Sequence, residues 1–218
     1  YGSAEEVVGH CLERLKDTKG LFSATKVWTP LGVRGKKQIE GSFKLWGLKN
    51  IDLYQVHSLV DWEEHLATLR EMKEEGRIRY VGVTTSHGRR HKELEKILKT
   101  QELDFVQLTY NALDREAEAR LLPLAAEKGI AVLANRPFRR GALLDRVARH
   151  PLPEWAGEVG ADNWPQLLLK FVVSHPAVTC AIPATSRADH MRENMGAARG
   201  HLPDASQRRR IADLVVSL

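Results

Sequence analysis

The chain has 218 residues, enough for one substantial hydrophobic core, and its 43% hydrophobic and 28% charged residues are ordinary for a globular protein. A net charge of +5 favours anionic ligands such as phosphates, but it is too small and too interspersed with acids to indicate a nucleic-acid partner. The sequence has no apolar run of about 20 residues, so we expect no membrane span. Cys11 and Cys180 form no zinc or disulfide pattern, so we expect no metal.

Six apolar runs of strand type recur along the chain, and the first five begin 26 to 30 residues apart. In chain order they are LFSATKV from 21, IDLYQVHS from 51, IRYVGVTT from 78, DFVQLTY from 104, IAVLAN from 130 and VTCAIPAT from 178. Each run is continuous rather than alternating, which is typical of strands that are buried on both faces.

Helical patterns lie between these runs. The first begins at Ser3, which forms a capping-box pattern with Glu6, and carries an apolar face before a stop signal at Gly20. The others cover about 39–48, 61–76 (with an Asp61/Glu64 capping-box pattern), 90–99, 121–128, 164–174, 187–198 and 204–217. We expect the helix over 61–76 to bury Trp62, Leu66, Leu69 and Met72, and we expect a long loop over about 139–162.

Strands that alternate with helices predict parallel βα units. The α/β architecture is then either an open doubly wound sheet or part of an eight-stranded barrel. No G-x-G-x-x-G follows any strand, which disfavours the dinucleotide-binding fold. A complete barrel takes about 250 residues, so two further units would bring this chain close to that length. We therefore expect a (β/α)8 TIM barrel of which about six of the eight βα units are present.

The predicted strands are apolar in the middle and polar near their carboxyl ends. The polar residues are Lys26, His57-Ser58, Thr84-Thr85, Gln107, Asn135-Arg136 and Thr185-Ser186-Arg187. In a barrel these ends meet at one face, which carries the active site.

Seven segments, taken in chain order, resemble the aldo-keto reductase family. They are YGSAEEVVG, FSATKVW, NIDLYQVHS, GRIRYVGVTTS, DFVQLTYN, AEKGIAVLANRPFRRG and CAIPATSRADHMRENMGA. The resemblance covers the whole chain and implies one barrel domain over 1–218. Members of the family carry two more strands upstream, the second ending in a catalytic aspartate a few residues before the tyrosine. We therefore expect the chain to be a fragment that lacks the first two strands and that aspartate.

The resemblance implies reduction of an aldehyde or ketone by hydride transfer from NADPH. Tyr1 would be the general acid, and Lys26 would lower its pKa from the ordinary value of about 10. His57 would donate a hydrogen bond to the carbonyl oxygen. The three residues are 25 and 31 positions apart, about one βα unit each. Trp28, just past Lys26, is a candidate for the substrate pocket.

The resemblance also assigns cofactor-binding residues. Gln107 matches a glutamine that holds the nicotinamide amide, and Thr84 and Thr85 stand where the family usually has Ser-Asn. Asn135 stands where an aromatic residue often stacks on the nicotinamide, a departure from the pattern, and Phe138 is the candidate replacement. The phosphate and adenine positions are Arg136, Arg139, Arg140 and Gly141 for the pyrophosphate, Thr185, Ser186 and Arg187 for the 2′-phosphate, and Glu193 and Asn194 for the adenine. His190 stands where many members have an arginine.

Two alternatives remain open at this point. A barrel lyase or aldolase would use Lys26 as a Schiff-base nucleophile. A catalytically impaired relative would bind NADP without efficient turnover, because the aspartate is missing. We expect a cytoplasmic protein with a small carbonyl substrate. Export of a longer precursor is also compatible with the sequence. The sequence carries no signal for an oligomeric state.

Overall fold

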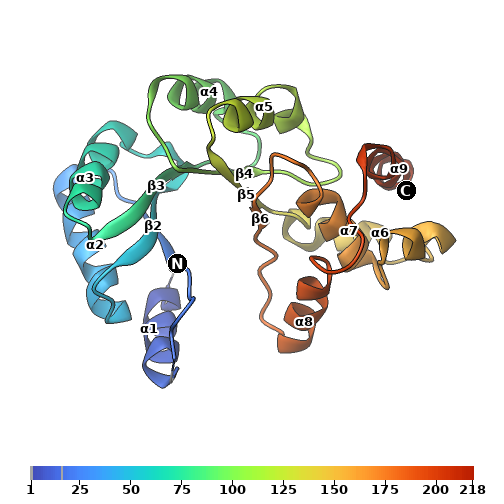
Figure 1. Ribbon diagram of the computed structural model, residues 1–218, viewed down its shortest axis with the longest axis horizontal. Coiled ribbons are helices and arrows are strands. Elements are labelled where there is room, and N and C mark those ends of the chain that lie inside the picture. Colours follow the sequence, from blue (N-terminus) through green and yellow to red (C-terminus); the bar gives the residue numbers. More distant parts are fainter. Residues whose placement is uncertain (1, 16) are drawn as a thin grey trace. The chain divides into compact units, whose positions relative to one another are not determined.

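The computed structural model describes residues 2–15 and 17–218 and divides into two compact units (Figure 1). Unit 1 comprises the residues up to Thr84 together with Glu102–Phe105, and unit 2 comprises Thr85–Gln101 and Val106–Leu218. The strands follow one another in chain order, β1-β2-β3-β4-β5-β6. This order, with helices between the strands, confirms the predicted succession of βα units.

The elements up to β3 are α1 (Ala4–Arg14), β1 (Ala24–Val27), α2 (Gly32–Trp46), β2 (Ile51–Val56), the 3-10 turn η1 (His57–Leu59), α3 (Trp62–Glu74) and β3 (Ile78–Thr84). Those after β3 are α4 (His91–Thr100), β4 (Phe105–Thr109), η2 (Glu116–Ala119), α5 (Leu121–Glu127), β5 (Ala131–Asn135), η3 (Arg139–Gly141), α6 (Ala142–Val147), η4 (Glu154–Val159), α7 (Trp164–Val173), β6 (Cys180–Ala181), α8 (Ala188–Gly196) and α9 (Ala205–Ser217).

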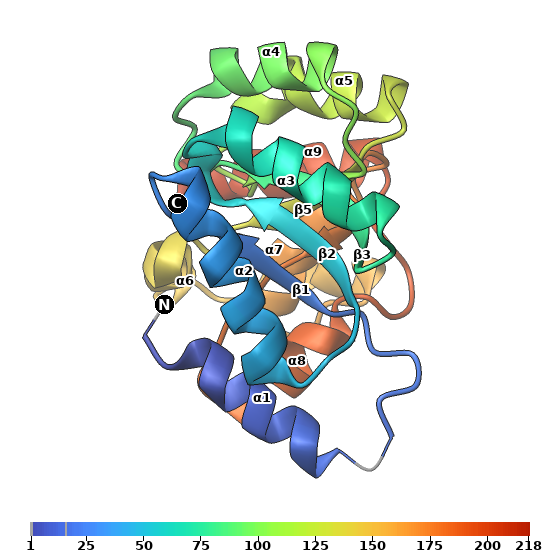
Figure 2. The same ribbon diagram turned by 90° about the vertical axis from the view of Figure 1, so that its left-hand side faces the viewer.

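In unit 1, helices α2 and α3 cover one face of the parallel strands β1, β2 and β3 (Figure 2). The inward face predicted for α3 is confirmed at Leu66, Leu69 and Met72, which are buried, whereas Trp62 is only half-buried. Burial of a leucine side chain stabilises the fold by about 1.5–3 kcal/mol, so the helix is held on the sheet mainly by this apolar face.

Helix α1 packs against α2 through a residue that has no side chain. A Cβ atom added to Gly9 would lie 1.9 Å from the carbonyl oxygen of Leu45. The apolar residues Val7 and Val8, by contrast, are 57% and 39% exposed. The close backbone approach therefore docks α1 more than its apolar residues do.

A polar network holds the same helix to β1 and α2. The carboxylate of Glu5 accepts hydrogen bonds from Thr25 Oγ1 at 2.8 Å and from Ser42 Oγ at 2.7 Å. The hydroxyl of the buried Tyr54 donates to Ser42 Oγ at 2.9 Å. Because Thr25 precedes Lys26 in β1, the network ties α1 directly to the lysine strand.

Several local predictions were wrong. Neither Ser3 nor Asp61 caps its helix with its side chain, and Asp61 adopts a left-handed conformation. Helix α1 ends at Arg14, before Gly20, and the segment 139–162 contains α6 and η4 rather than a featureless loop. The side-chain capping box lies instead at the start of α9, between Asp204 and Gln207. A capping pattern in the sequence records compatible residue types, but the hydrogen bond also needs an extended backbone at the cap.

In unit 2, helix α7 contacts α6, α8, α9 and β6. Its start is well specified, because Asn163 accepts a hydrogen bond from the backbone N–H of Gln166 and Pro165 occupies the first turn. Leu167, Phe171 and Val172 are buried on this helix. Among the described residues, no helix combines the length and apolar composition needed to cross a membrane.

We expect Gly9→Ala to destabilise the protein by about 2–4 kcal/mol, because the new methyl group would overlap the backbone of α2. The matched control is Gly41→Ala, since a Cβ at Gly41 meets nothing within 4 Å. The control should be neutral or gain up to about 1 kcal/mol, since alanine favours helix over glycine. Urea unfolding of both variants measures the difference, and equal stability of the two would contradict this docking.

Candidate active site

In unit 1, the parallel pairing of β1 with β2 brings Lys26 and His57 to neighbouring strand ends. Lys26 lies opposite Gln55, and Val27 lies opposite Val56, the residue before His57. Trp28, the residue directly after β1, contacts the His57 ring, with 5.7 Å between ring centroids in an edge-on arrangement. Trp28 is 57% exposed, so one face of this aromatic pair is open to a ligand.

Lys26 and His57 are both half-buried, and desolvation lowers the pKa of each. Desolvation lowers the pKa of Lys26, and no ion pair with Lys26 occurs among the residues that the structure describes. Desolvation also lowers the pKa of His57, and the positive charge of Lys26 adds to this effect. His57 is therefore the neutral imidazole at neutral pH, in a position to donate one N–H.

The turn that carries His57 has an unusual backbone. Ser58 and Leu59 both have a φ of 54°, in the left-handed region that residues with a side chain rarely adopt. The backbone N–H of Ser58 donates to Thr84 Oγ1 at 2.9 Å, so the end of β3 holds this turn in place. Strained turns of this kind concentrate at functional sites.

In unit 2, Thr85, Gln107 and Asn135 form a polar group at consecutive strand ends. The Thr85 N–H donates to the Gln107 carbonyl oxygen at 2.8 Å. Asn135 Nδ2 donates to the Thr85 carbonyl at 2.8 Å, and Asn135 Oδ1 accepts from Thr109 Oγ1 at 2.7 Å. All of these side chains are buried, and the Asn135 amide is used at both ends within the protein.

Two buried polar atoms of this group and one of the neighbouring Arg136 lack hydrogen-bond partners. They are Thr85 Oγ1, Gln107 Oε1 and Arg136 Nε, in the part of the chain that the structure describes. An unsatisfied buried polar group costs about 1–3 kcal/mol. A ligand with its own amide would supply a donor to Gln107 and a partner to Thr85, so these residues fit the carboxamide of a nicotinamide cofactor.

A basic cluster occupies the loops that follow β3 and β5. Desolvation lowers the pKa of His87, and the positive charges of Arg136, Arg140 and Arg89 lower it further. Arg136, Arg139 and Arg140 all have left-handed backbone conformations. Arg139 is ion-paired with Asp114 at 3.0 Å, so the guanidinium groups of Arg136 and Arg140 are better placed to attract phosphate than that of Arg139.

Helix α8 and its neighbouring segments are held by buried polar residues of α7 and by Asn194 of α8 itself. Gln166 Nε2 donates to the Glu193 carbonyl at 3.4 Å, and Asn194 Nδ2 donates to the Pro183 carbonyl at 3.3 Å. Lys170, fully buried, donates from Nζ to the carbonyl oxygens of Arg199 and His201 at 2.7 and 2.9 Å. The segment from Pro183 to His201 is thus fastened at several points.

Arg187, at the start of α8, already has a partner. Its guanidinium forms a bidentate ion pair with Asp189, which lowers the pKa of that carboxyl, and both side chains are exposed. An exposed ion pair contributes only about 0–1 kcal/mol. Exchange of Asp189 for a phosphate group is therefore inexpensive. His190 is exposed beside this pair, while Asn194 is buried.

The sequence interpretation missed several residues of this region. Thr109 was detectable, because it lies two positions beyond Gln107 in the same strand and so on the same face. Asn111 and Asp114 are joined by a hydrogen bond of 2.9 Å, and Asn111 also donates to the Arg136 carbonyl. No local pattern indicates the contact with Arg136, because it joins positions 25 residues apart, whereas Asn111 and Asp114 are only three residues apart. Tyr1, the predicted general acid, lies outside the described residues.

The chain matches a known protein family over nearly its whole length. The sequence profile described as "Aldo/keto reductase family" matches residues 1–214. The chain belongs to this family of oxidoreductases, which use a nicotinamide cofactor, and its six βα units are those of a partial (β/α)8 barrel. The fold class and the family predicted from the sequence are both confirmed.

Individual relatives are distant. The aldo-keto reductase str7 of Strobilurus tenacellus is 27% identical over 91% of this chain and 70% of its own length. The NADH-specific methylglyoxal reductase of Escherichia coli is 25% identical over 94% of this chain and 77% of its own length. The holo form of an aldo-keto reductase from Bacillus halodurans superposes with a TM-score of 0.77, at 26% identity, over 96% of this chain and 76% of that one.

We expect Lys26→Met to raise the melting temperature at pH 7 by about 2–4 °C, because a partly buried, desolvated cation is replaced by an apolar side chain of similar size. The unfolded chain keeps the ordinary lysine pKa of 10.5, whereas burial lowers the pKa in the folded state. Between these two values the unfolded state binds more protons, so wild-type stability rises with pH.

The advantage of Lys26→Met should therefore shrink between pH 7 and pH 10, as measured by thermal unfolding at several pH values. Lys44→Met is the control, since Lys44 is exposed on α2, and its effect should not depend on pH. An unchanged difference in melting temperature between wild type and Lys26→Met across this range would contradict the interpretation of Lys26 as a desolvated cation.

Proposed function

We propose that this chain is an NADPH-dependent reductase that converts aldehydes or ketones to alcohols, with Tyr1, Lys26 and His57 as its catalytic residues. The observation that supports the proposal most is the pairing of β1 with β2, which aligns the lysine with the histidine turn. Membership of an oxidoreductase family gives the reaction class. The reductases named among its relatives make a small carbonyl compound the expected substrate class.

A nicotinamide cofactor, when bound by these residues, would supply the hydride for the carbonyl carbon. His57, neutral at working pH because burial lowers its pKa, donates an N–H to the carbonyl oxygen and orients the substrate. The Tyr1 hydroxyl transfers its proton to the same oxygen as negative charge develops there, which leaves a phenolate. The alcohol product thus gains the hydride at carbon and the proton at oxygen.

Lys26 makes this proton transfer possible near neutral pH. The ordinary pKa of tyrosine, about 10, is too high for easy donation. A neighbouring ammonium group stabilises the phenolate and lowers that pKa. Burial also lowers the pKa of Lys26 itself, so the two groups become better matched and Lys26 can return a proton to the phenolate.

For the cofactor, we propose that Thr84, Thr85 and Gln107 receive the nicotinamide amide, with Asn135 positioning Thr85. Arg136, Arg140 and Gly141 would hold the pyrophosphate. The adenosine end would be held by residues at the start of α8 and just before it, namely Thr185, Ser186, Arg187, His190, Glu193 and Asn194. Trp28 would form one wall of the substrate pocket beside His57.

The choice of NADPH over NADH depends on Arg187, since a bidentate guanidinium suits the 2′-phosphate that distinguishes the two cofactors. One relative of similar identity is named an NADH-specific reductase, which makes cofactor choice the feature to test first. A lyase that uses Lys26 as a Schiff base would also benefit from a lowered lysine pKa. The oxidoreductase relatives favour the reductase.

We expect NADPH to quench tryptophan fluorescence saturably, with a lower Kd than NADH. Arg187→Ala should weaken NADPH binding by about 10-fold, the loss of one charge-assisted pair, and leave NADH binding within about twofold. Arg192→Ala is the matched control, because Arg192 is another exposed arginine of α8. Equal losses of affinity for NADPH and NADH, or equal effects of the two variants, would contradict the assignment of Arg187 to the 2′-phosphate.

Turnover is a separate measurement on the same sample. NADPH consumption with an aromatic aldehyde, followed by absorbance, should fall at least about 100-fold in Tyr1→Phe, with NADPH binding retained. Wild-type binding without turnover would identify the chain as a cofactor-binding relative. Borohydride trapping of a carbonyl substrate on Lys26 would instead support the lyase.

A further inference from the structure

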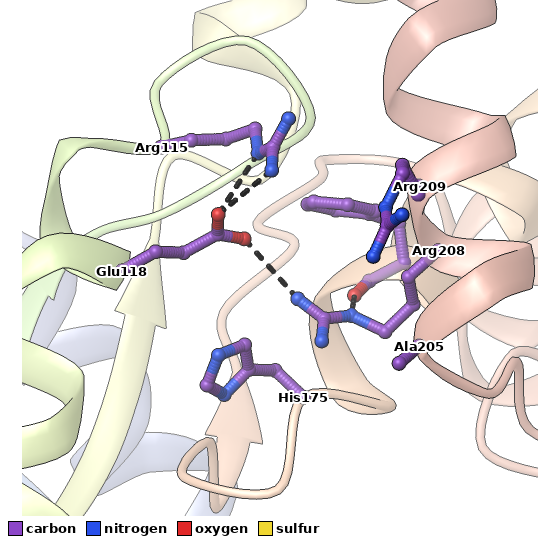
Figure 3. A pocket seen from close by; sticks show the side chains of 7 residues that line it. Arg115, Glu118, His175, Ala205, Arg208 and Arg209 are labelled. Carbon is purple, nitrogen blue, oxygen red and sulfur yellow. Dashed lines mark hydrogen bonds and ion pairs between the residues drawn. The ribbon is translucent and has the colours of Figure 1, made fainter.

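A second polar pocket lies in unit 2, among residues that have no part in the proposed reaction. It has a volume of about 240 Å³ and is lined by Arg115, Glu118, Phe171, His175, Ala205, Arg208 and Arg209. The first two come from the η2 region, Phe171 and His175 from α7 and the turn after it, and the last three from the first turns of α9 (Figure 3).

Two of the arginines are fixed by the single carboxylate of the pocket. Arg115 donates from Nε and Nη2 to Glu118 Oε2 at 3.1 and 2.8 Å, and Arg208 donates from Nη2 to Glu118 Oε1 at 3.2 Å. Arg208 Nε also donates to the Phe171 carbonyl at 3.3 Å, and the Arg208 guanidinium lies over the Phe171 ring, 5.2 Å from its centroid. The Arg208 side chain is only 12% exposed.

The charge of the residues that line the pocket is not balanced, although Asp213, outside this lining, also acts electrostatically on Arg115. Glu118 contributes one negative charge against the three positive charges of Arg115, Arg208 and Arg209. Burial and the nearby Arg208 lower the pKa of His175, so this ring is neutral at pH 7 and the lining keeps a net charge of +2. Among the described residues, Arg209 forms no ion pair, although its guanidinium faces the same opening (Figure 3).

We propose that this pocket binds a phosphate group, either as free orthophosphate or as the phosphate of a small ester. Arg115 and Arg208 are held rigid by Glu118, so little side-chain freedom is lost when they meet an anion. Arg209 adds a guanidinium that can donate two parallel hydrogen bonds to an oxyanion. Sites for drug-sized ligands occupy about 300–1,000 Å³, so the smaller volume here suits a compact anion.

The additional positive charge that Arg209 contributes distinguishes a ligand site from a purely structural ion-pair network. Glu118 with Arg115 and Arg208 would already complete such a network, and the Tyr110 hydroxyl, within hydrogen-bond distance of both Glu118 and Arg208, extends it. Arg209 is not needed for it. Phosphate would lie between the fixed pair and Arg209, with its charge compensated by the surplus of the lining.

The test is a titration of the 218-residue chain with sodium phosphate at pH 7 and constant ionic strength, followed by the NMR resonances of arginine Nε–H groups. Arg208 Nε–H is the reporter, because its hydrogen bond to Phe171 shields it from exchange with water. We expect this resonance to shift saturably. The same titration with glycerol phosphate distinguishes the two sources, since tighter binding identifies a phosphoester and weaker binding a free anion.

Arg209→Ala should weaken the phosphate-dependent shift by at least about fivefold, a loss of about 1 kcal/mol. Arg210→Ala is the control, because Arg210 pairs with Glu158 and stacks on Trp155, away from the pocket. Its affinity should stay within about twofold of wild type. Phosphate that leaves the Arg208 resonance unshifted, or equal losses in both variants, would overturn the proposal. Neither variant touches the proposed cofactor residues, so the result is independent of whether NADPH binds.

Discussion

The alignment of β1 with β2 is the constraint on which the proposed chemistry depends. Parallel hydrogen bonding fixes Lys26 opposite Gln55 and places the His57 turn at the adjoining strand end. A register shift by one residue would turn every side chain of the strand to the other face, which would remove Lys26 from the site. The apolar faces of α2 and α3 resist such a shift, so the core of unit 1 determines the geometry of its acid–base groups.

The succession of strands and helices could be predicted from the sequence, because continuous apolar runs and helical periodicity are local signals. Lys26, His57 and Gln107 could be located for the same reason, since each lies at or near the end of an apolar run. The docking of α1 could not be predicted. It depends on the approach of Gly9 to Leu45, two residues in different helices, and on a carboxylate shared between Thr25 and Ser42. The helix within the segment 139–162 was also missed, because α6 is short and its cap has a left-handed backbone.

The two units contribute chemically different groups to the proposed function. Unit 1 supplies Lys26 and His57, and desolvation lowers the pKa of both side chains. Unit 2 supplies buried amide and hydroxyl groups with unsatisfied atoms, at Thr85 and Gln107, and basic loops rich in left-handed residues. Each unit carries a cost in isolation, either a desolvated cation or a polar atom without a partner. Such costs are typical of sites shaped by function rather than by stability alone.

Lys170 illustrates a different kind of specificity. Its buried ammonium group is satisfied by the carbonyl oxygens of Arg199 and His201, and every amino acid offers the same carbonyl. The side chains of Arg199 and His201 are exposed. The contact with Lys170 therefore depends on the path of the backbone and not on the residue type at these two positions. Substitutions of Arg199 and His201 can therefore leave α8 in place, whereas Gly200 between them has a φ of 68°, which favours glycine. Among homologues, the residue types at 199 and 201 should therefore vary more than the glycine at 200.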